Sequence, residues 1–279
     1  MQLTAQISGR TNGICGGGGP LIVAIHGGTY SSAYFDVPGF SLMARAATNA
    51  IACIAIDRPG YGATAMLEPA LMDIPGQARF LTEALGALWA DHRADHTGVV
   101  LVGHSIGAAI AATIAASQPA WPLLGLAISG VGLVTNPGDH DRWQALPDIP
   151  QVEVPAEVKD HVMFGPAGSF DPATPARTHA AGAPAPKAEL LSITGPWHDL
   201  VRPVLRQIAV PVHYRQAEHD RLWIVDRGEV DRFAAGLTAA PLVDARMMAG
   251  AGHCIDFHHR GAAFQLQQLG FALECAAGA

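Results

Sequence analysis

The chain of 279 residues carries a net charge of −7, with 17 Lys and Arg against 24 Asp and Glu, and 49% of its residues are hydrophobic. This length suits one large α/β domain with an inserted segment, and the acidic balance excludes an electrostatic footprint for nucleic acid or for an anionic membrane surface. The N-terminus has no pattern of a secretion signal, and the four cysteines form no C-x-x-C pair, so we expect a cytoplasmic protein with reduced thiols.

The N-terminal stretch contains a weak strand pattern, a glycine-rich turn and a strong strand pattern. Gln2–Ser8 alternates apolar and polar side chains, which predicts a half-buried strand. Gly13–Pro20 includes four consecutive glycines. No Lys-Ser/Thr pair and no helix follow them, so a flexible hairpin connection is favoured over a phosphate cradle. Leu21–Ile25 is continuously apolar, which indicates a strand covered on both faces.

A second buried strand is predicted at Ile51–Ile56, followed by Asp57-Arg58-Pro59-Gly60-Tyr61-Gly62. Asp57 could serve catalysis in principle. We expect it instead to hold this turn and to pair locally with Arg58. Apolar residues then recur at helical spacing over Asp73–Asp91, which predicts a helix that crosses to the next strand.

The most informative stretch runs from Val99 to Ala116. Its first part is an apolar, β-branched run that stops at Gly103, and a helical run of small residues begins after Ser105. G-x-S-x-G lies between them, in the strand–turn–helix context of a nucleophile elbow. Such a turn exposes the serine hydroxyl, and the new helix directs free N–H groups toward a ligand. A dinucleotide-binding turn is disfavoured because Ser105 occupies its second glycine position.

The pattern changes after the strand predicted at Leu123–Ser129. Between Thr135 and Pro196 the chain has many prolines and few apolar periods, so we expect an irregular lid without sheet. This divides the chain into a core of residues 1–134 and 197–279 and an inserted lid of residues 135–196. The few aromatic residues here are candidates either to line a substrate pocket or to anchor the lid, namely Trp143, Phe164, Phe170 and Trp197.

Regular patterns return in the last third of the chain. Strands are predicted at Val210–Arg215 and Leu242–Met247, and helices at Asp226–Leu237 and Ala262–Cys275. Strands that alternate with helices predict a mostly parallel, doubly wound sheet with helices on both faces. In such a sheet, ligands bind at the carboxyl ends of the strands.

Three chemically complementary residues follow predicted strands at that edge, namely Ser105, Asp220 and His253. A serine hydroxyl is too weak an acid to attack a carbonyl unaided, so an imidazole must remove its proton. A carboxylate must hold that imidazole in one tautomer and stabilise its cation. The three residues therefore form a candidate catalytic triad, with Ser105 as nucleophile, His253 as base and Asp220 as orienting acid.

Acyl transfer also requires two N–H donors for the developing oxyanion. We expect one from Ile106, the residue after the nucleophile. The other should come from the loop after Leu21–Ile25, with Gly28 as first choice and Thr29 as second. The further candidates for substrate contact are Tyr30, His104, Trp143 and Trp197.

Other acids and histidines in the C-terminal third remain alternatives. Glu218 lies two residues before Asp220 and would point to the same side of an extended segment, so it is a rival acid. His258 and His259 are interpreted as polar helix surface and not as a metal site. Three more carboxylates stay open as the acid: Asp199, Asp226 and Asp256.

Several pieces of the chain together resemble a known family. They are His26-Gly27-Gly28, Asp57–Gly62, Gly103–Gly107, the turn at Asp220 and Gly250-Ala251-Gly252-His253. These motifs, and the order Ser, Asp, His, resemble the α/β-hydrolase superfamily over nearly the whole chain. One departure is Ala217, where members often carry glycine before the acid. The resemblance implies an α/β fold with a mostly parallel, doubly wound sheet, and neither a cofactor nor a metal is implied. The inserted Pro-rich lid is expected from its composition and does not resemble one particular subfamily.

These features predict a serine hydrolase that cleaves a carboxylic ester or thioester of a small molecule through an acyl-enzyme intermediate. The resemblance also allows thioester release or cyclisation in a biosynthetic pathway, a cofactor-free peroxidase side activity, or cleavage of C–C and cyanohydrin bonds. A small-ligand receptor of the same fold is an alternative of another class, although a complete triad argues against pure binding. We expect a monomer or a homodimer.

Overall fold

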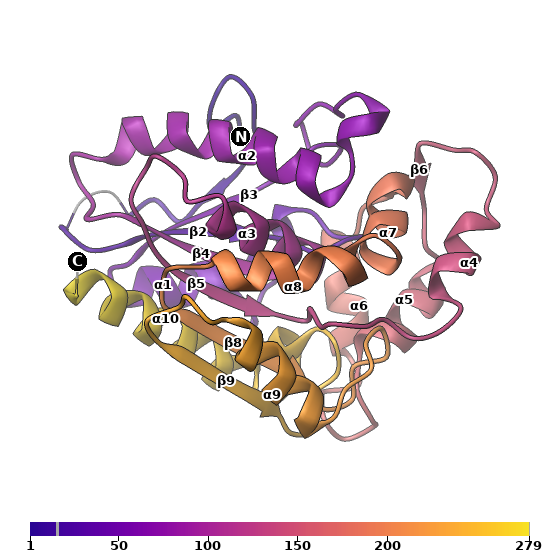
Figure 1. Cartoon of the computed structure of the whole chain (residues 1–279). Coiled ribbons are helices and arrows are strands. Elements are labelled where there is room, and N and C mark those ends of the chain that lie inside the picture. Colours follow the sequence, from indigo (N-terminus) through magenta and orange to yellow (C-terminus); the bar gives the residue numbers. More distant parts are fainter. Residues whose placement is uncertain (15–16, 279) are drawn as a thin grey trace.

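A seven-stranded sheet runs through the computed structural model, which describes residues 1–14 and 17–278 (Figure 1). The strand order is β1-β3-β2-β4-β5-β8-β9, and only β1 runs antiparallel to its neighbour. The prediction of a mostly parallel sheet is therefore confirmed. The strands are β1 (Gly9–Thr11), β2 (Leu21–Ile25), β3 (Ala52–Ile56), β4 (Val99–His104), β5 (Leu123–Ser129), β8 (Val212–Ala217) and β9 (Val243–Met248).

Helices cover both faces of the sheet because its central strands are apolar on both sides. Alternate residues of β2 point into two different cores: Leu21 and Val23 into one, Ile22 and Ala24 into the other. The first core lies under α2 (Ile74–His92), α3 (Ile106–Ala116), α8 (Trp197–Gln207) and α9 (Arg227–Gly236), and the second under α1 (Leu42–Thr48) and α10 (Gly261–Ala277). No helix within the described residues is long and apolar enough to cross a membrane.

The chain changes direction across the sheet at β2. From β2 it passes to β3 on one side, and it then returns to place β4 on the other side of β2. The loops that leave the carboxyl ends of β2 and β4 therefore diverge, and such a switch point opens a crevice for a ligand. The loop after β2 begins at His26, and the turn after β4 contains Ser105.

Of the N-terminal predictions, the strand at Leu21–Ile25 is confirmed as β2 and the other two are wrong. Gln2–Ser8 is not a strand, although Gln2 and Ser8 form one isolated bridge, and the edge strand β1 begins only at Gly9. The glycine-rich stretch Gly13–Pro20 is not a hairpin, because β3 lies between β1 and β2. Cys15 and Gly16 lie outside the described residues.

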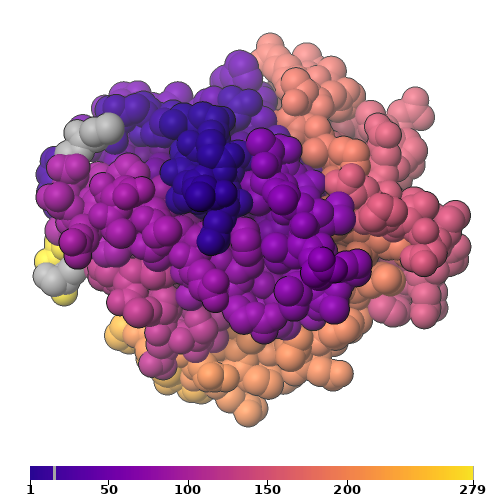
Figure 2. Space-filling view, turned by 90° about the horizontal axis from the view of Figure 1, so that it is seen from above, coloured from indigo at the N-terminus to yellow at the C-terminus, as the bar shows by residue number. Residues whose placement is uncertain are grey.

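Residues 135–196 form an ordered unit at the carboxyl end of the sheet, on the right of Figure 1 and at one side of the space-filling view (Figure 2). The expectation of an irregular segment without sheet is wrong. Prolines stand at helix starts, where a missing N–H costs nothing: Pro155 precedes α5, Pro175 lies in the first turn of α6 and Pro186 precedes α7. The elements are α4 (Asp139–Gln144), β6 (Gln151–Val152), α5 (Ala156–Met163), α6 (Thr174–Thr178), η3 (His179–Ala181), β7 (Ala185–Pro186) and α7 (Lys187–Thr194), with β6 antiparallel to β7.

Three short helices lie outside this unit, namely η1 (Ser32–Asp36), η2 (Pro69–Leu71) and η4 (Ile255–Phe257).

Candidate active site

Ser105 occupies a strained turn between β4 and α3. Its φ of +56° lies in the left-handed region that a serine rarely adopts, and its amide donates to the carbonyl oxygen of Ser129 at 2.9 Å. Close packing requires glycine two residues later: a Cβ on Gly107 would stand 2.2 Å from the carbonyl oxygen of Ile25. The turn therefore has the strand–turn–helix geometry expected of the motif.

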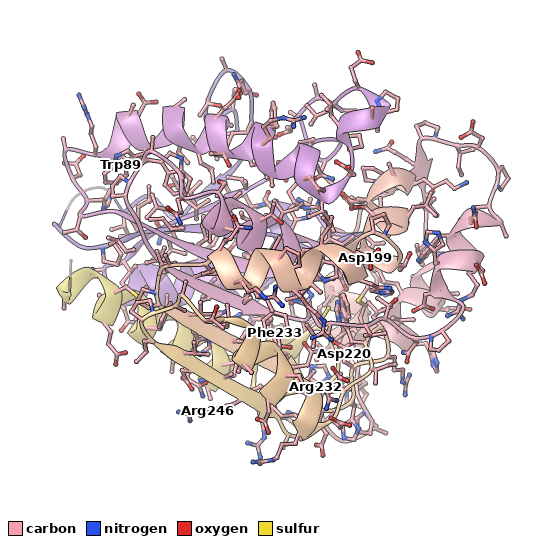
Figure 3. All side chains as sticks on the ribbon, viewed as in Figure 1. Trp89, Asp199, Asp220, Arg232, Phe233 and Arg246 are labelled. Carbon is pink, nitrogen blue, oxygen red and sulfur yellow. The ribbon has the colours of Figure 1, made fainter. Side chains whose placement is uncertain are left out.

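His253 and Asp220 are brought together by the loops after β9 and β8. Nδ1 of His253 donates to Oδ2 of Asp220 at 2.7 Å, and both side chains are fully buried. The carboxylate is fixed by two further donors, Nε2 of Gln216 and the amide of Leu222, each at 2.9 Å. Figure 3 places Asp220 just beyond the end of β8. This arrangement orients the imidazole through Nδ1 and leaves Nε2 for chemistry.

The structure does not hydrogen-bond Ser105 to His253. Nε2 of His253 is buried and has no partner among the described residues. The His253 ring nevertheless packs 4.8 Å from the ring of His104, the residue before Ser105. Nucleophile–base hydrogen bonds are often long in ligand-free sites and tighten when substrate binds.

His104 does not line the cavity: it is buried, and its ring packs against the ring of His253. The ring stacks on Tyr34 at 4.7 Å, and the hydroxyl of Tyr34 donates to Asp256 at 2.8 Å. Burial, followed by the neighbouring His253 and His26, holds the pKa of His104 well below its usual range. A neutral His104 therefore places no competing charge beside His253 when His253 accepts a proton.

The rival acids have other partners. Glu218 accepts from the amide of Gly250 at 2.7 Å. Asp226 caps α9 by accepting from the amide of Glu229 at 2.7 Å. Asp256 accepts from Tyr34 and Gln265, and Asp199 lies in the first turn of α8. Asp220 is thus the only one of the candidates bonded to His253.

The amide geometry favours Gly28 over Thr29 as an oxyanion donor. Gly28, Thr29, Ser105 and Ile106 all line one cavity. The amide of Thr29 already donates to the hydroxyl of Tyr61 at 3.3 Å. Within the described chain, no hydrogen bond uses the amides of Gly28 and Ile106, and the latter belongs to the first helical turn, where amides lack helical partners.

A buried ion pair that the sequence analysis missed holds the Gly28 loop. Arg58 donates from Nε to the carbonyl oxygen of His26 at 2.8 Å and from Nη2 to that of Gly27 at 3.0 Å. The guanidinium also binds the carboxylate of Glu189 on α7 at 2.6 Å, with both side chains fully buried. The predicted Asp57–Arg58 pair is wrong, because Asp57 accepts from Ser8 and from the amide of Ser32 instead.

The burial of His258 is a second feature that the sequence did not predict. Its side chain was interpreted as polar helix surface, but it is only 3% exposed. Its Nε2 accepts from the amides of Gly165 and Gly252, each at 2.9 Å, and its Nδ1 donates to the carbonyl oxygen of Cys254 at 2.8 Å. Burial lowers the pKa of His258 to about 4. The ring therefore ties residues 135–196 to the loop that carries His253.

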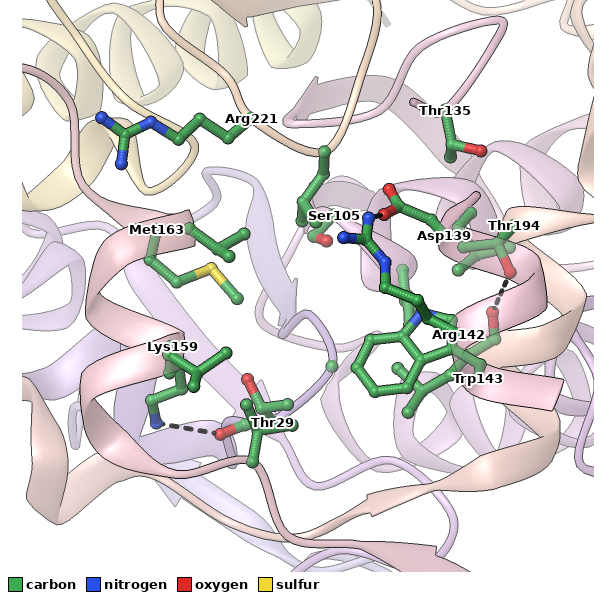
Figure 4. A pocket seen from close by; sticks show the side chains of 18 of the residues that line it. Thr29, Ser105, Thr135, Asp139, Arg142, Trp143, Lys159, Met163, Thr194 and Arg221 are labelled. Carbon is green, nitrogen blue, oxygen red and sulfur yellow. Dashed lines mark hydrogen bonds and ion pairs between the residues drawn. The ribbon is translucent and has the colours of Figure 1, made fainter. Parts of the chain in front are cut away.

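The cavity has a volume of about 460 Å³ and a largely apolar lining (Figure 4). Of the aromatic candidates, Trp143 lines it. Tyr30 does not, because its ring is buried between Tyr34 and Lys159. Trp197 is also fully buried, and its Nε1 donates to the carbonyl oxygen of Gly132 at 3.0 Å. Among the described residues, no group of three or more metal-ligating side chains is present.

Comparison with known proteins places this architecture in a family. The family model described as "Alpha/beta hydrolase family" matches residues 22–264. No curated protein matches the chain. An esterase from Exiguobacterium antarcticum has a TM-score of 0.70 at 17% identity, with 95% of each chain covered. A monoacylglycerol lipase from Paleococcus ferrophilus has a TM-score of 0.69 at 16% identity, covering 97% of this chain and 99% of that one.

An N-acyl homoserine lactonase complexed with N-hexanoyl homoserine lactone is similar to the same extent, with a TM-score of 0.67 at 17% identity and coverage of 98% of this chain and 96% of that one. At these identities the structural likeness establishes the fold alone. The family model, however, spans most of the chain. This protein belongs to the alpha/beta hydrolase family.

Proposed function

We propose that this protein is a serine hydrolase that cleaves a carboxylic ester or thioester of a small molecule. The observation that carries the proposal is the 2.7 Å hydrogen bond from Nδ1 of His253 to Asp220, with Nε2 of His253 unpartnered among the residues that the structure describes. The ring of His253 packs on His104, directly before the strained Ser105 at the cavity wall. Family membership and the esterase fold of the neighbours agree with this class of reaction.

In the first half-reaction, Nε2 of His253 takes the hydroxyl proton of Ser105 while Oγ attacks the scissile carbonyl carbon. The amides of Gly28 and Ile106 donate to the resulting oxyanion. The tetrahedral intermediate then collapses, and His253 gives its proton to the departing alcohol or thiol. Ser105 is left as an acyl ester.

In the second half-reaction, water attacks the acyl carbonyl carbon while Nε2 of His253 takes its proton. The tetrahedral intermediate then collapses, the bond to Oγ of Ser105 breaks, and Oγ takes the proton back from His253 as the carboxylic acid leaves. Asp220 keeps the proton on Nδ1 of His253 and stabilises the imidazolium through both transfers. Arg58 contributes indirectly, because it holds the carbonyl oxygens of His26 and Gly27 and so fixes the direction of the Gly28 amide.

We further infer that residues 135–196 act as a lid. This segment supplies about two thirds of the residues that line the cavity, including Trp143, Met163 and Ile193. It is therefore positioned to select the acyl group and to exclude water from the reaction.

A panel of ester and thioester substrates tests the proposal. We expect multiple turnover on at least one of them, and a burst of leaving group where deacylation is slow. Tight binding of acyl compounds without any acyl-enzyme detectable by mass spectrometry would instead identify a small-ligand receptor.

A further inference from the structure

Lys159 is one of only two lysines in the chain, and it lines the candidate active-site cavity. It comes from α5, is 6% exposed, and lies across the cavity from Trp143 (Figure 4). Its ammonium donates to the carbonyl oxygen of Thr29 at 3.3 Å and lies 4.1 Å from the centre of the Tyr30 ring. A Cβ at Gly182 would stand 2.7 Å from Nζ, so this glycine leaves the space that the ammonium occupies.

This ammonium has no carboxylate partner within the part of the chain that the structure describes. The adjacent acid, Asp160, pairs with His179 at 2.9 Å instead. A buried ammonium with one hydrogen bond is costly, and an anion that completes its coordination removes that cost. Burial lowers the pKa of Lys159, while Cys254 and Asp160 oppose that shift.

The cavity carries excess positive charge although the whole chain has a net charge of −7. Arg142, Lys159 and Arg221 line it, and Asp139 is the one acidic residue among the described lining. Asp139 pairs with Arg142, and Arg221 donates to the carbonyl oxygen of His161, so Lys159 is the buried cation of the lining that faces a ligand without a carboxylate partner among the described residues. Most of the other lining is apolar, so the cavity suits an apolar chain that ends in an anion.

We propose that the substrate carries a carboxylate on an apolar chain and that this carboxylate binds the ammonium of Lys159. The inference rests on the proposed ester or thioester hydrolysis and adds the charge of the substrate to it. The carbonyl oxygen of Thr29 accepts from Lys159, and Thr29 directly follows Gly28, the proposed oxyanion donor. The anion and the scissile carbonyl therefore occupy neighbouring parts of one cavity.

Two matched pairs of esters test this assignment, with kcat/KM as the readout. The first pair carries the charge on the acyl side: 4-nitrophenyl hydrogen adipate against 4-nitrophenyl 6-methylheptanoate, in which an isopropyl group replaces the carboxylate. The second pair carries it on the leaving group: the hexanoyl esters of 4-hydroxybenzoate and 4-hydroxybenzamide. We expect the wild type to prefer the charged member of at least one pair by roughly tenfold or more, as for hydrogen bonds to charged groups.

Lys159→Met should reduce that preference to within about threefold, and Lys159→Arg should retain part of it. Arg202→Met removes one positive charge from the exposed side of α8, outside the cavity, and should leave the preference unchanged. Gly182→Ala supplies an independent variant, because its Cβ would displace the ammonium without changing the charge.

The outcomes separate this inference from the proposed function. Equal rates for both members of each pair in the wild type would overturn the inference and leave ester hydrolysis standing. A loss in Lys159→Met that is equal for charged and neutral esters would show that Lys159 only holds the Thr29 carbonyl, and would also overturn it. No hydrolysis of any ester or thioester would remove the proposed function itself. If Lys159→Met does not fold, the wild-type pairs and Gly182→Ala decide.

Discussion

The sheet around Ser105 and residues 135–196 are ordered by different means. The sheet is built from continuous apolar strands that bury both faces, so local sequence and final structure agree residue by residue. Residues 135–196 consist of short helices with weak apolar patterns. Buried polar contacts dock them on the sheet domain, among them Glu189 on Arg58 and the amide of Gly165 on His258. The sheet positions the residues that are proposed to carry out the reaction, and residues 135–196 complete the cavity.

In the part of the site that the sheet positions, a large loss of activity is expected on substitution of Asp220, in the loop after β8. Asp220→Asn should lower kcat by roughly 10² to 10⁴, because an amide of the same shape favours the wrong tautomer of His253. Glu218→Gln is the matched control, since Glu218 binds the amide of Gly250 and not His253, and it should cost less than about tenfold. Both variants are assayed on the same ester under one condition. A severe loss in Glu218→Gln beside near-normal Asp220→Asn would place the acid two residues earlier.

The docking of residues 135–196 is tested at Glu189. Glu189→Gln should destabilise the protein by about 3 kcal/mol, because the buried Arg58 guanidinium loses its counter-charge. The activity of the folded variant should also fall, since Arg58 holds the loop that carries Gly28. Urea unfolding measures the first effect and kcat the second. Glu153→Gln, an exposed acid of the same unit, should change stability by less than about 0.5 kcal/mol.

The second docking contact predicts a pH dependence. Burial lowers the pKa of His258 to about 4, so between pH 6.5 and about 4 the unfolded chain binds a proton that the folded chain does not. Stability should therefore fall as pH falls through that window, by about 1–3 kcal/mol for this residue. His213, whose pKa burial also lowers to about 4, contributes in the same window.

Unfolding midpoints in urea, measured near pH 7, 6 and 5, give this slope. His258→Gln should flatten it, because the unfolded-state protonation of that position is removed while the His213 contribution stays. A slope identical to that of the wild type would show that protonation of His258 is not linked to folding.

The smallest effect is expected on selectivity. Trp143 lines the cavity from α4, so Trp143→Ala should change the ratio of kcat/KM between a hexanoate and an acetate ester by roughly tenfold. The acetate alone should stay within about threefold of the wild type. Trp197→Phe is the control, because Trp197 lies in the core outside the cavity lining. Unchanged acyl selectivity in a folded Trp143→Ala protein would assign the unit a structural role only.

The same contrast explains which predictions from sequence succeeded. The predictions for β2 and β5 match the observed residues, and those for β3 and β4 agree within one or two residues, because an uninterrupted apolar run leaves few other folds for such a segment. The turn at Ser105 was predictable from Gly103 and Gly107, because the close packing of the backbone there leaves no room for a Cβ.

The missed features depend on contacts between distant residues. Arg58 and Glu189 are separated by 131 positions, and nothing local to either indicates the pair. His258 is buried because Gly165 supplies one of its two N–H donors, although its own neighbourhood is polar. Short helices such as α5 and α7 are stabilised by docking more than by their own propensity, so their patterns were weak.

The central claim is that Ser105 is the nucleophile of this site. Intact-mass measurement after treatment with a fluorophosphonate tests it most directly, because this reagent phosphonylates a serine that is activated by an adjacent base. We expect one adduct on the wild-type protein, located on the peptide that contains Ser105, and none on a folded Ser105→Ala variant, whose ester turnover should also fall by roughly 10³ or more. An equal adduct on Ser105→Ala, or full turnover by that variant, would contradict the account.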